Sequence, residues 1–317
     1  MSRAGAARRL ATAALYGGGG LGLLGGLGAG LLKAEALLAR RMIGVSDARP
    51  PPPDGVYGEA LGGEPISVLL IGDSAAVGYG MTTVGDTPGA MIAQGLSHIA
   101  GRSVRLTSRP VVGARSLDLD DQIDDGLAYE PRVAAIVVGA NDVTHNVRTS
   151  AAVRALDSAV RRLLESGCAV VVGTCPDLGT VRPIPQPLRL FAQRWSRRLA
   201  AAQMITVVEA GGRAVSLAGL LGRDFNDAPD EMFGADRFHP SFAGYAGMVA
   251  AMLPSIAVAA GVWDEDEESA DYPDGTVLPV SFAAAEAARV AGSEVARIRV
   301  DGKERGHRGR WAALRRR

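Results

Sequence analysis

The stretch ISVLLIGDS, residues 66–74, decides the fold, because it joins a buried strand to a candidate catalytic side chain. The apolar run ISVLLI and the glycine that ends it are typical of a strand covered on both faces in a parallel sheet. Asp73 and Ser74 follow the glycine directly. In open parallel sheets, ligands bind in the crevice beyond the carboxyl ends of the strands. Ser74 is therefore predicted to lie in that crevice.

Downstream of this strand, short apolar runs alternate with longer amphipathic segments. Further strands are predicted over residues 103–108, 133–139, 168–174 and 204–210, and helices over residues 87–100, 117–128, 150–166, 187–203 and 241–253. Strands that alternate with helices indicate a mostly parallel sheet with helices on both faces. The expected fold class is therefore a three-layer α/β/α sandwich.

The overall composition excludes several classes of function. Lys plus Arg and Asp plus Glu both number 34, so the chain lacks the basic footprint of a nucleic-acid-binding domain. The two cysteines, Cys168 and Cys175, flank a predicted strand, which holds them too far apart for a disulfide. No spacing of Cys and His is typical of a zinc site. We expect neither a nucleic-acid partner nor a bound metal.

An apolar segment near the amino terminus predicts a membrane anchor. The residues from Leu10 to Leu32 include no charged side chain over 23 positions, which is long enough for a helix to span a bilayer. Ala34-Glu35-Ala36 matches a small-x-small cleavage site, so removal of the segment by processing stays open. We expect a location in the cell membrane or envelope, with the catalytic domain outside the cytoplasm.

Changes in composition divide the chain into four parts. Residues 1–40 form the predicted signal anchor, and residues 41–64, which are rich in Pro and Gly, read as a linker. The α/β pattern occupies residues 65–260, which we take as the catalytic domain. Residues 261–317 form a charged extension that contains an acidic run and ends in a basic tail.

A serine hydroxyl becomes a good nucleophile only when a nearby base removes its proton. Among the four histidines, His239 lies in the sequence DRFHP, just before the last predicted helix. The spacing to Asp236 lets one short loop present both an imidazole and a carboxylate that orients it. His145 also follows a predicted strand and is the competing candidate for the base.

Acyl transfer also requires hydrogen-bond donors for the developing oxyanion. Asn141, in the sequence GAND, follows the strand predicted over residues 133–139. Gly113, in PVVGARS, follows the strand predicted over residues 103–108 and offers an unobstructed backbone N–H. Taken alone, Asn141 would be read as a helix cap and Gly113 as a turn.

Together, the blocks around Ser74, Gly113, Asn141 and His239 resemble, in identity and order, the SGNH/GDSL hydrolase family. The resemblance extends over roughly residues 66–256. It implies a flavodoxin-like fold with a five-stranded parallel sheet and no metal or organic cofactor. The apolar amino-terminal segment and the abundance of Ala, Gly and Arg are also similar to envelope-associated actinobacterial members of that family.

The resemblance assigns a role to each candidate residue. Ser74 would be the nucleophile, His239 the general base and then acid, and Asp236 its orienting partner. Ser74, Gly113 and Asn141 would form the oxyanion hole. Ala75 stands where many members of the family have leucine.

These roles predict a serine esterase that cleaves small acyl or acetyl esters through an acyl-enzyme. The expected partner is a small-molecule ester, with an envelope lipid or an acylated sugar as candidate natural substrates. One alternative is an acyltransferase that uses the same acyl-enzyme to acylate a sugar or glycerol hydroxyl. A second is a non-catalytic binding protein on the same fold, against which the intact Ser74, Asp236 and His239 argue.

Overall fold

The computed structural model describes residues 30–39, 50–263, 299–300 and 303–304. Its main sheet has six strands in the order β1-β3-β2-β4-β5-β6. The strands of this sheet are β1 (Gly55–Tyr57), β2 (Ile66–Gly72), β3 (Val104–Ser108), β4 (Val133–Val137), β5 (Ala169–Gly173) and β6 (Arg213–Val215). The last five run parallel to one another, whereas β1 pairs antiparallel with β3 at one edge. A separate two-stranded ladder joins β7 (Arg299–Val300) and β8 (Lys303–Glu304).

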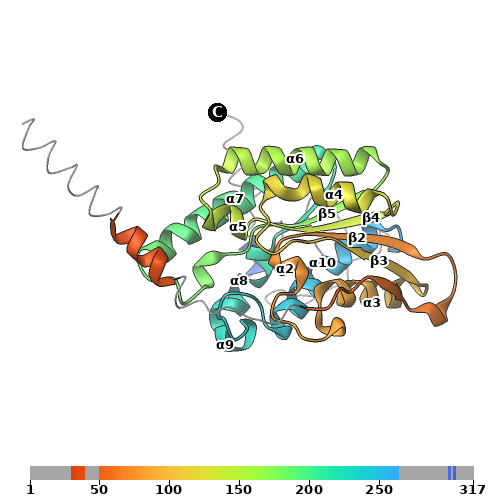
Figure 1. Cartoon of the computed structure of the whole chain (residues 1–317), viewed down its shortest axis with the longest axis horizontal. Helices are drawn as coiled ribbons and strands as arrows, with labels where there is room; N and C mark the ends of the chain where they lie inside the picture. Colours follow the sequence, from red (N-terminus) through yellow and green to blue (C-terminus); the bar gives the residue numbers. More distant parts are fainter. Residues whose placement is uncertain (1–29, 40–49, 264–298, 301–302, 305–317) are drawn as a thin grey trace, which may run out of the picture.

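Helices cover both faces of the sheet. The longer ones are α3 (Pro88–Ala100), α4 (Leu119–Leu127), α6 (Thr149–Glu165), α7 (Leu188–Ala210), α8 (Leu217–Asp227) and α10 (Phe242–Ala259). In Figure 1, α4 and α6 lie above the sheet, and α3 and α10 lie below it. Alternate side chains of β2 follow this division: Val68 and Leu70 join the core with α3 and α10, and Leu69 and Ile71 join the core with α4, α6 and α7. This confirms the predicted three-layer α/β/α fold.

Four of the five predicted strands are confirmed, and the fifth prediction, over residues 204–210, is wrong. Those residues form the last two turns of α7, and the strand that completes the sheet is β6, only three residues long. Met204, Val207 and Ala210 pack against the same core cluster at three-residue spacing, which is the period of a helix. The β-branched residues in this segment therefore serve helix packing against the sheet.

The last helix is also longer than predicted. We expected it to end at Leu253, before Pro254, but α10 continues through the proline to Ala259. Pro254 lacks the N–H for one helical hydrogen bond. Met252 and Ile256 on either side of it are fully buried, and their burial offsets that loss.

Part of the segment expected to be a linker belongs to the sheet. Residues 55–57 form β1, in register with residues 104–106 of β3. The hydroxyl of Tyr57 donates a hydrogen bond to the carbonyl of Pro53 at 2.7 Å, which closes this edge against the proline-rich turn. The sheet therefore has one antiparallel strand in addition to the five parallel strands expected.

The predicted anchor lies almost entirely outside the described residues, and so does most of the carboxyl-terminal extension. Residues 30–39 are helical, and the Glu35 carboxylate accepts a hydrogen bond of 2.8 Å from the backbone N–H of Leu188, the first residue of α7. Within the described part of the chain, α10 is the one helix long and apolar enough to cross a membrane. Over half of α10 is buried, and it packs against the sheet as a core helix of the fold.

Candidate active site

The end of β2 positions Ser74. At Gly72, φ is +137°, and a Cβ atom would lie 2.0 Å from the carbonyl oxygen of Val137 on β4, so only glycine permits this close approach of the two strands. Asp73 then caps the short helix α2 (Ser74–Val77), where its carboxylate accepts a hydrogen bond of 2.9 Å from the N–H of Ala75. Ser74 is the first residue of this helix and is 7% exposed.

A hydrogen-bonded chain links Ser74 to His239 and Asp236. The Nε2 atom of His239 lies 2.9 Å from Ser74 Oγ, and its Nδ1 atom lies 2.6 Å from Asp236 Oδ2. The other carboxylate oxygen of Asp236 accepts hydrogen bonds of 2.9 Å from the N–H groups of Phe238 and His239. With the proton on Nδ1 donated to Asp236, Nε2 is free to accept the hydroxyl proton of Ser74. Ser74 and His239 are 165 positions apart in sequence and meet at one edge of the sheet.

The surroundings of Asp236 favour its charged form. Burial acts to raise the pKa of the Asp236 carboxyl, but the hydrogen bonds from the His239 ring and from two backbone N–H groups outweigh it. The net pKa is lowered from the ordinary value of 3.8. A carboxylate that stays ionised stabilises the imidazolium that forms when His239 takes up a proton.

Aromatic side chains fix the imidazole of His239 from two sides. The ring of Tyr79 lies 4.4 Å from it, centroid to centroid, and the ring of Phe238 meets it edge-on at 5.0 Å. The fully buried Tyr245 of α10 donates a hydrogen bond of 3.0 Å to the carbonyl of Tyr79. The position of the imidazole is therefore coupled to the packing of the core.

Asn141 lies beside the loop that contains Gly113. Asn141 belongs to α5 (Ala140–Thr144), directly after β4, and its side-chain N–H donates a hydrogen bond of 3.1 Å to the carbonyl of Ala114. A carboxamide has two N–H donors, so one remains for another acceptor. Gly113 is exposed and has a φ of +86°, a left-handed conformation that favours glycine. Both residues thus follow strands that neighbour or adjoin β2 in the sheet, as expected.

Asp142 fixes the same loop, a role that the sequence analysis missed. Its buried carboxylate accepts hydrogen bonds from the N–H of Ser116, at 3.1 and 3.2 Å, and from the Ser116 hydroxyl at 2.9 Å. Ser116 begins the turn η3 (Ser116–Asp118), two residues after Ala114. The signal was present in the sequence, because Asp142 directly follows Asn141 in GAND.

Asp73 is a second buried carboxyl that the sequence analysis left without a role. Its burial raises the pKa of the Asp73 carboxyl from 3.8 to about 7, although hydrogen bonds from the N–H groups of Ala75 and Gly139 and the proximity of His239 act in the opposite direction. Asp73 therefore lies next to Ser74 in an environment that disfavours its negative charge.

The competing histidine is not brought to Ser74. His145 is exposed at the end of α5, and its Nδ1 atom lies 3.0 Å from the carbonyl oxygen of Asn141 in the preceding turn. Of the two candidate bases, only His239 makes a hydrogen bond with Ser74.

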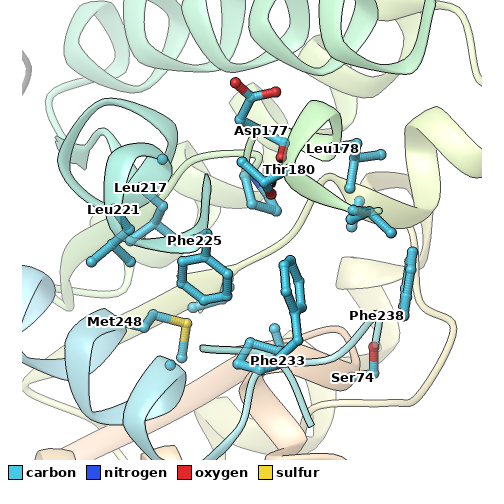
Figure 2. A pocket seen from close by; sticks show the side chains of 18 of the residues that line it. Ser74, Asp177, Leu178, Thr180, Leu217, Leu221, Phe225, Phe233, Phe238 and Met248 are labelled. Carbon is cyan, nitrogen blue, oxygen red and sulfur yellow. Dashed lines mark hydrogen bonds between the residues drawn. The ribbon is translucent and has the colours of Figure 1, made fainter. Parts of the chain in front are cut away.

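Ser74 opens onto an apolar cavity. Figure 2 shows Ser74 and Phe238 on one side of this cavity, Leu217, Leu221 and Met248 on the other, and Phe225 and Phe233 between them. The rings of Phe225 and Phe233 pack edge to face at 4.9 Å. A second, larger cavity of about 530 Å³ lies between residues 30–39, α5 and α7, and it shares Leu178 and Phe238 with the first. In the described residues, no cluster of His, Cys, Asp or Glu that could hold a metal ion is found.

A parallel α/β sheet with Ser, His and Asp hydrogen-bonded in series at the carboxyl ends of its strands is typical of serine hydrolases. The profile of the GDSL-like lipase/acylhydrolase family matches residues 70–246, and the chain belongs to this family. It is 40% identical over 250 residues to the GDSL-like esterase Rv1075c of Mycobacterium tuberculosis, an alignment that covers 75% of this chain and 78% of the relative. The chain is accordingly a hydrolase that acts on esters.

Solved structures with similar folds include other esterases and hydrolases. LAE5, an alpha/beta hydrolase enzyme from the metagenome of Lake Arreo in Spain, is 19% identical with a TM-score of 0.49 and covers 62% of this chain and 95% of its own. A catalytic mutant of the acetylxylan esterase Axe2 from Geobacillus stearothermophilus is 18% identical with a TM-score of 0.48 and covers 62% of this chain and 94% of its own.

Proposed function

We propose that the chain is a serine esterase that cleaves small acyl esters through an acyl-enzyme on Ser74. The observation that carries the proposal is the imidazole of His239, which lies 2.9 Å from Ser74 Oγ and 2.6 Å from Asp236 Oδ2. These distances are within the range for proton transfer between a nucleophile, a base and an orienting carboxylate. No other described histidine makes a hydrogen bond with Ser74.

The reaction follows from this geometry in two halves. Ser74 Oγ attacks the ester carbonyl carbon while His239 Nε2 takes the hydroxyl proton, and Asp236 stabilises the resulting imidazolium. The tetrahedral intermediate collapses as His239 returns the proton to the departing alcohol, which leaves the acyl group on Ser74. A water molecule, deprotonated by the same imidazole, then attacks the acyl carbonyl. The products are a carboxylic acid and the free serine.

The oxyanion of each tetrahedral intermediate would be held by three donors. The N–H of Ser74 belongs to the first residue of α2, where helical N–H groups have no intrahelical partner. Asn141 contributes the side-chain N–H that it does not use for Ala114, and Gly113 contributes its backbone N–H. The hydrogen bonds from Asn141 and Ser116 to their partners support this role, because they fix the Gly113 loop relative to α5.

The same proposal places the enzyme at the cell membrane or in the envelope. The support is the uncharged run from Leu10 to Leu32 and the docking of residues 30–39 on α7. An ester of an envelope lipid or of an acylated sugar would be within reach of an enzyme at that location.

A fluorophosphonate probe tests the nucleophile, because it reacts covalently with activated serines. We expect the probe to label the wild-type chain and to leave Ser74→Ala unlabelled, and we expect ester turnover to fall by at least about a thousandfold in that variant. Labelling of Ser74→Ala at the wild-type level would refute the assignment of the nucleophile.

The two histidines provide a matched pair in the same assay. His239→Ala should abolish both labelling and turnover, whereas His145→Ala should leave both within about twofold of wild type, since His145 is exposed and has no contact with Ser74. The opposite result would make His145 the base.

A further inference from the structure

The walls of the cavity beside Ser74 are almost wholly apolar. They come from the segment after β5 with its turn η4 (Leu178–Thr180), from α8, from the segment after α9 (Pro229–Met232) and from α10. The side chains at the end remote from Ser74 are Leu217, Leu221 and Met248. Such a surface binds hydrocarbon and offers few partners for a buried hydroxyl group.

Of the two acidic residues in the lining, Asp73 lies beside Ser74, and Asp177 does not change the apolar character of the walls farther from it. In Figure 2 the carboxylate of Asp177 points away from Phe225 and Phe233. One of its oxygens accepts a hydrogen bond of 2.8 Å from the N–H of Gly179, and the other forms a salt bridge of 2.7 Å with Arg197 on α7. Its charge is therefore neutralised outside the cavity, and an acyl chain would contact the apolar part of the residue.

The size of the cavity sets the length of chain that it can hold. It offers about 90 Å³ to the centres of water-sized groups, and one such group needs roughly 10–15 Å³ on this scale. An acetyl group would leave most of that space unfilled, and a chain of more than about nine carbons would exceed it.

We propose that this cavity is the acyl-binding site and that it selects unbranched, saturated acyl groups of roughly four to eight carbons. This inference rests on the proposed function, because it takes the acyl carbon to be bonded to Ser74 Oγ. Burial of each methylene should raise kcat/KM by roughly fourfold until the cavity is filled.

Gly222 provides a way to shorten the cavity without disturbing the core. It lies on α8 and lines the cavity, and a Cβ atom added there would have Asp177 Cβ, at 4.0 Å, as its nearest neighbour. In Gly222→Leu the new side chain enters open space. Gly85→Leu is the matched control, because Gly85 is exposed in η2 (Val84–Asp86), has open space around it and does not line the cavity.

The experiment measures kcat/KM for the p-nitrophenyl esters of acetate, butyrate, hexanoate, octanoate, laurate and palmitate. For wild type we expect a rise of about a hundredfold or more from acetate to hexanoate and a fall at laurate. Gly222→Leu should lower hexanoate and octanoate turnover by about tenfold more than it lowers acetate turnover. Gly85→Leu should reproduce the wild-type profile.

A second variant tests the opposite change. Met248→Ala removes a side chain at the remote end, so the preferred ester should become longer by about two carbons. Two results would overturn the chain-length inference while leaving Ser74 as the nucleophile. In the first, wild type hydrolyses acetate as fast as hexanoate. In the second, Gly222→Leu affects all six esters equally. Failure of the proposed function would be distinct, since Ser74→Ala would then retain turnover of every ester.

Discussion

Asp73 has to accept hydrogen bonds from the backbone in a buried site that disfavours its negative charge. Its carboxyl oxygens accept hydrogen bonds from the N–H groups of Ala75 and Gly139, which fix the residue after Ser74 and the start of α5. Acceptor oxygens suffice for this purpose, and negative charge is not needed. Burial makes that charge costly and raises the pKa of Asp73 to about 7.

This raised pKa predicts how stability depends on pH. The folded chain keeps the Asp73 proton up to about pH 7, whereas the unfolded chain loses it near the ordinary value of 3.8. Between these values the folded state binds more protons, so this group makes the free energy of unfolding decrease as pH rises from about 4 to 7.

Asp73→Asn cannot ionise and keeps an acceptor oxygen. Relative to wild type, its free energy of unfolding should increase by about 2–4 kcal/mol between pH 4 and pH 8. Urea denaturation at several pH values measures this difference. A difference between the two proteins that does not change with pH would show that Asp73 does not titrate in this range.

At the scale of elements, the site depends on how the loop after β3 is held against α5. Asn141 bonds to the carbonyl of Ala114, and Asp142 bonds to the backbone and hydroxyl of Ser116. These two adjacent residues of α5 thus fix the loop on either side of Arg115. The loop itself contains Gly113, the proposed oxyanion donor whose position depends most on the backbone.

Ser116→Ala tests whether this loop positions a donor for the transition state. Loss of the hydroxyl should lower kcat by roughly three- to tenfold and leave KM nearly unchanged, because an oxyanion donor acts mainly in the transition state. The free energy of unfolding should fall by only about 1 kcal/mol. Ser67→Ala, which removes a serine hydroxyl bonded to Tyr129 at 3.2 Å on the opposite end of β2, is the control and should leave kcat unchanged. An increase in KM without loss of kcat would assign the loop to substrate binding.

For the whole molecule, the helix of residues 30–39 joins the amino-terminal segment to the edge of the sheet that carries the site. Its residue Glu35 is 7% exposed and bonds to the first N–H of α7, where a carboxylate is also favoured by the helix dipole. Its residue Ala39 packs in a core cluster with Val143 of α5. In Figure 1 this helix lies at the same end of the molecule as α5 and α8.

Deletion of residues 1–29 separates anchoring from catalysis, because it keeps the docked helix. The full chain should sediment with membranes, and the shortened chain should stay in the soluble fraction with kcat/KM for p-nitrophenyl butyrate within about twofold of the full chain. Ultracentrifugation of lysates followed by detection in each fraction makes the measurement. A full-length chain that keeps its amino terminus and remains soluble would contradict the prediction of an anchor.

The residues with the strongest chemistry could be predicted from the sequence because each lies in a short, local motif. GDS follows a buried strand, and DRFHP places His239 three residues after Asp236, so neither requires knowledge of the tertiary fold. The prediction of a strand over residues 204–210 was wrong because that segment depends on tertiary contacts. Its β-branched residues fit the period of a strand as well as that of a helix. The contacts of α7 with β6 and α6 favour the helix.

The cavity could not be predicted at all. Its lining residues range from Asp73 to Met248 and come from segments that meet only in the folded chain. The apolar side chains that form it are indistinguishable in sequence from those of the core, since both face inward on amphipathic helices. Only the three-dimensional arrangement shows that Leu221, a core residue, also lines the cavity, whereas Leu199 packs in the core without lining it.

Phe238 occupies the boundary between the two cavities and also touches the ring of His239. Leu178 and Phe238, which line both cavities, therefore separate a small compartment from a neighbouring one that is several times larger. In evolution or in a directed-evolution experiment, smaller side chains at these two positions would be enough to join the two volumes. If the small cavity binds the acyl group as proposed, this is a short mutational route from a selective esterase to a permissive one.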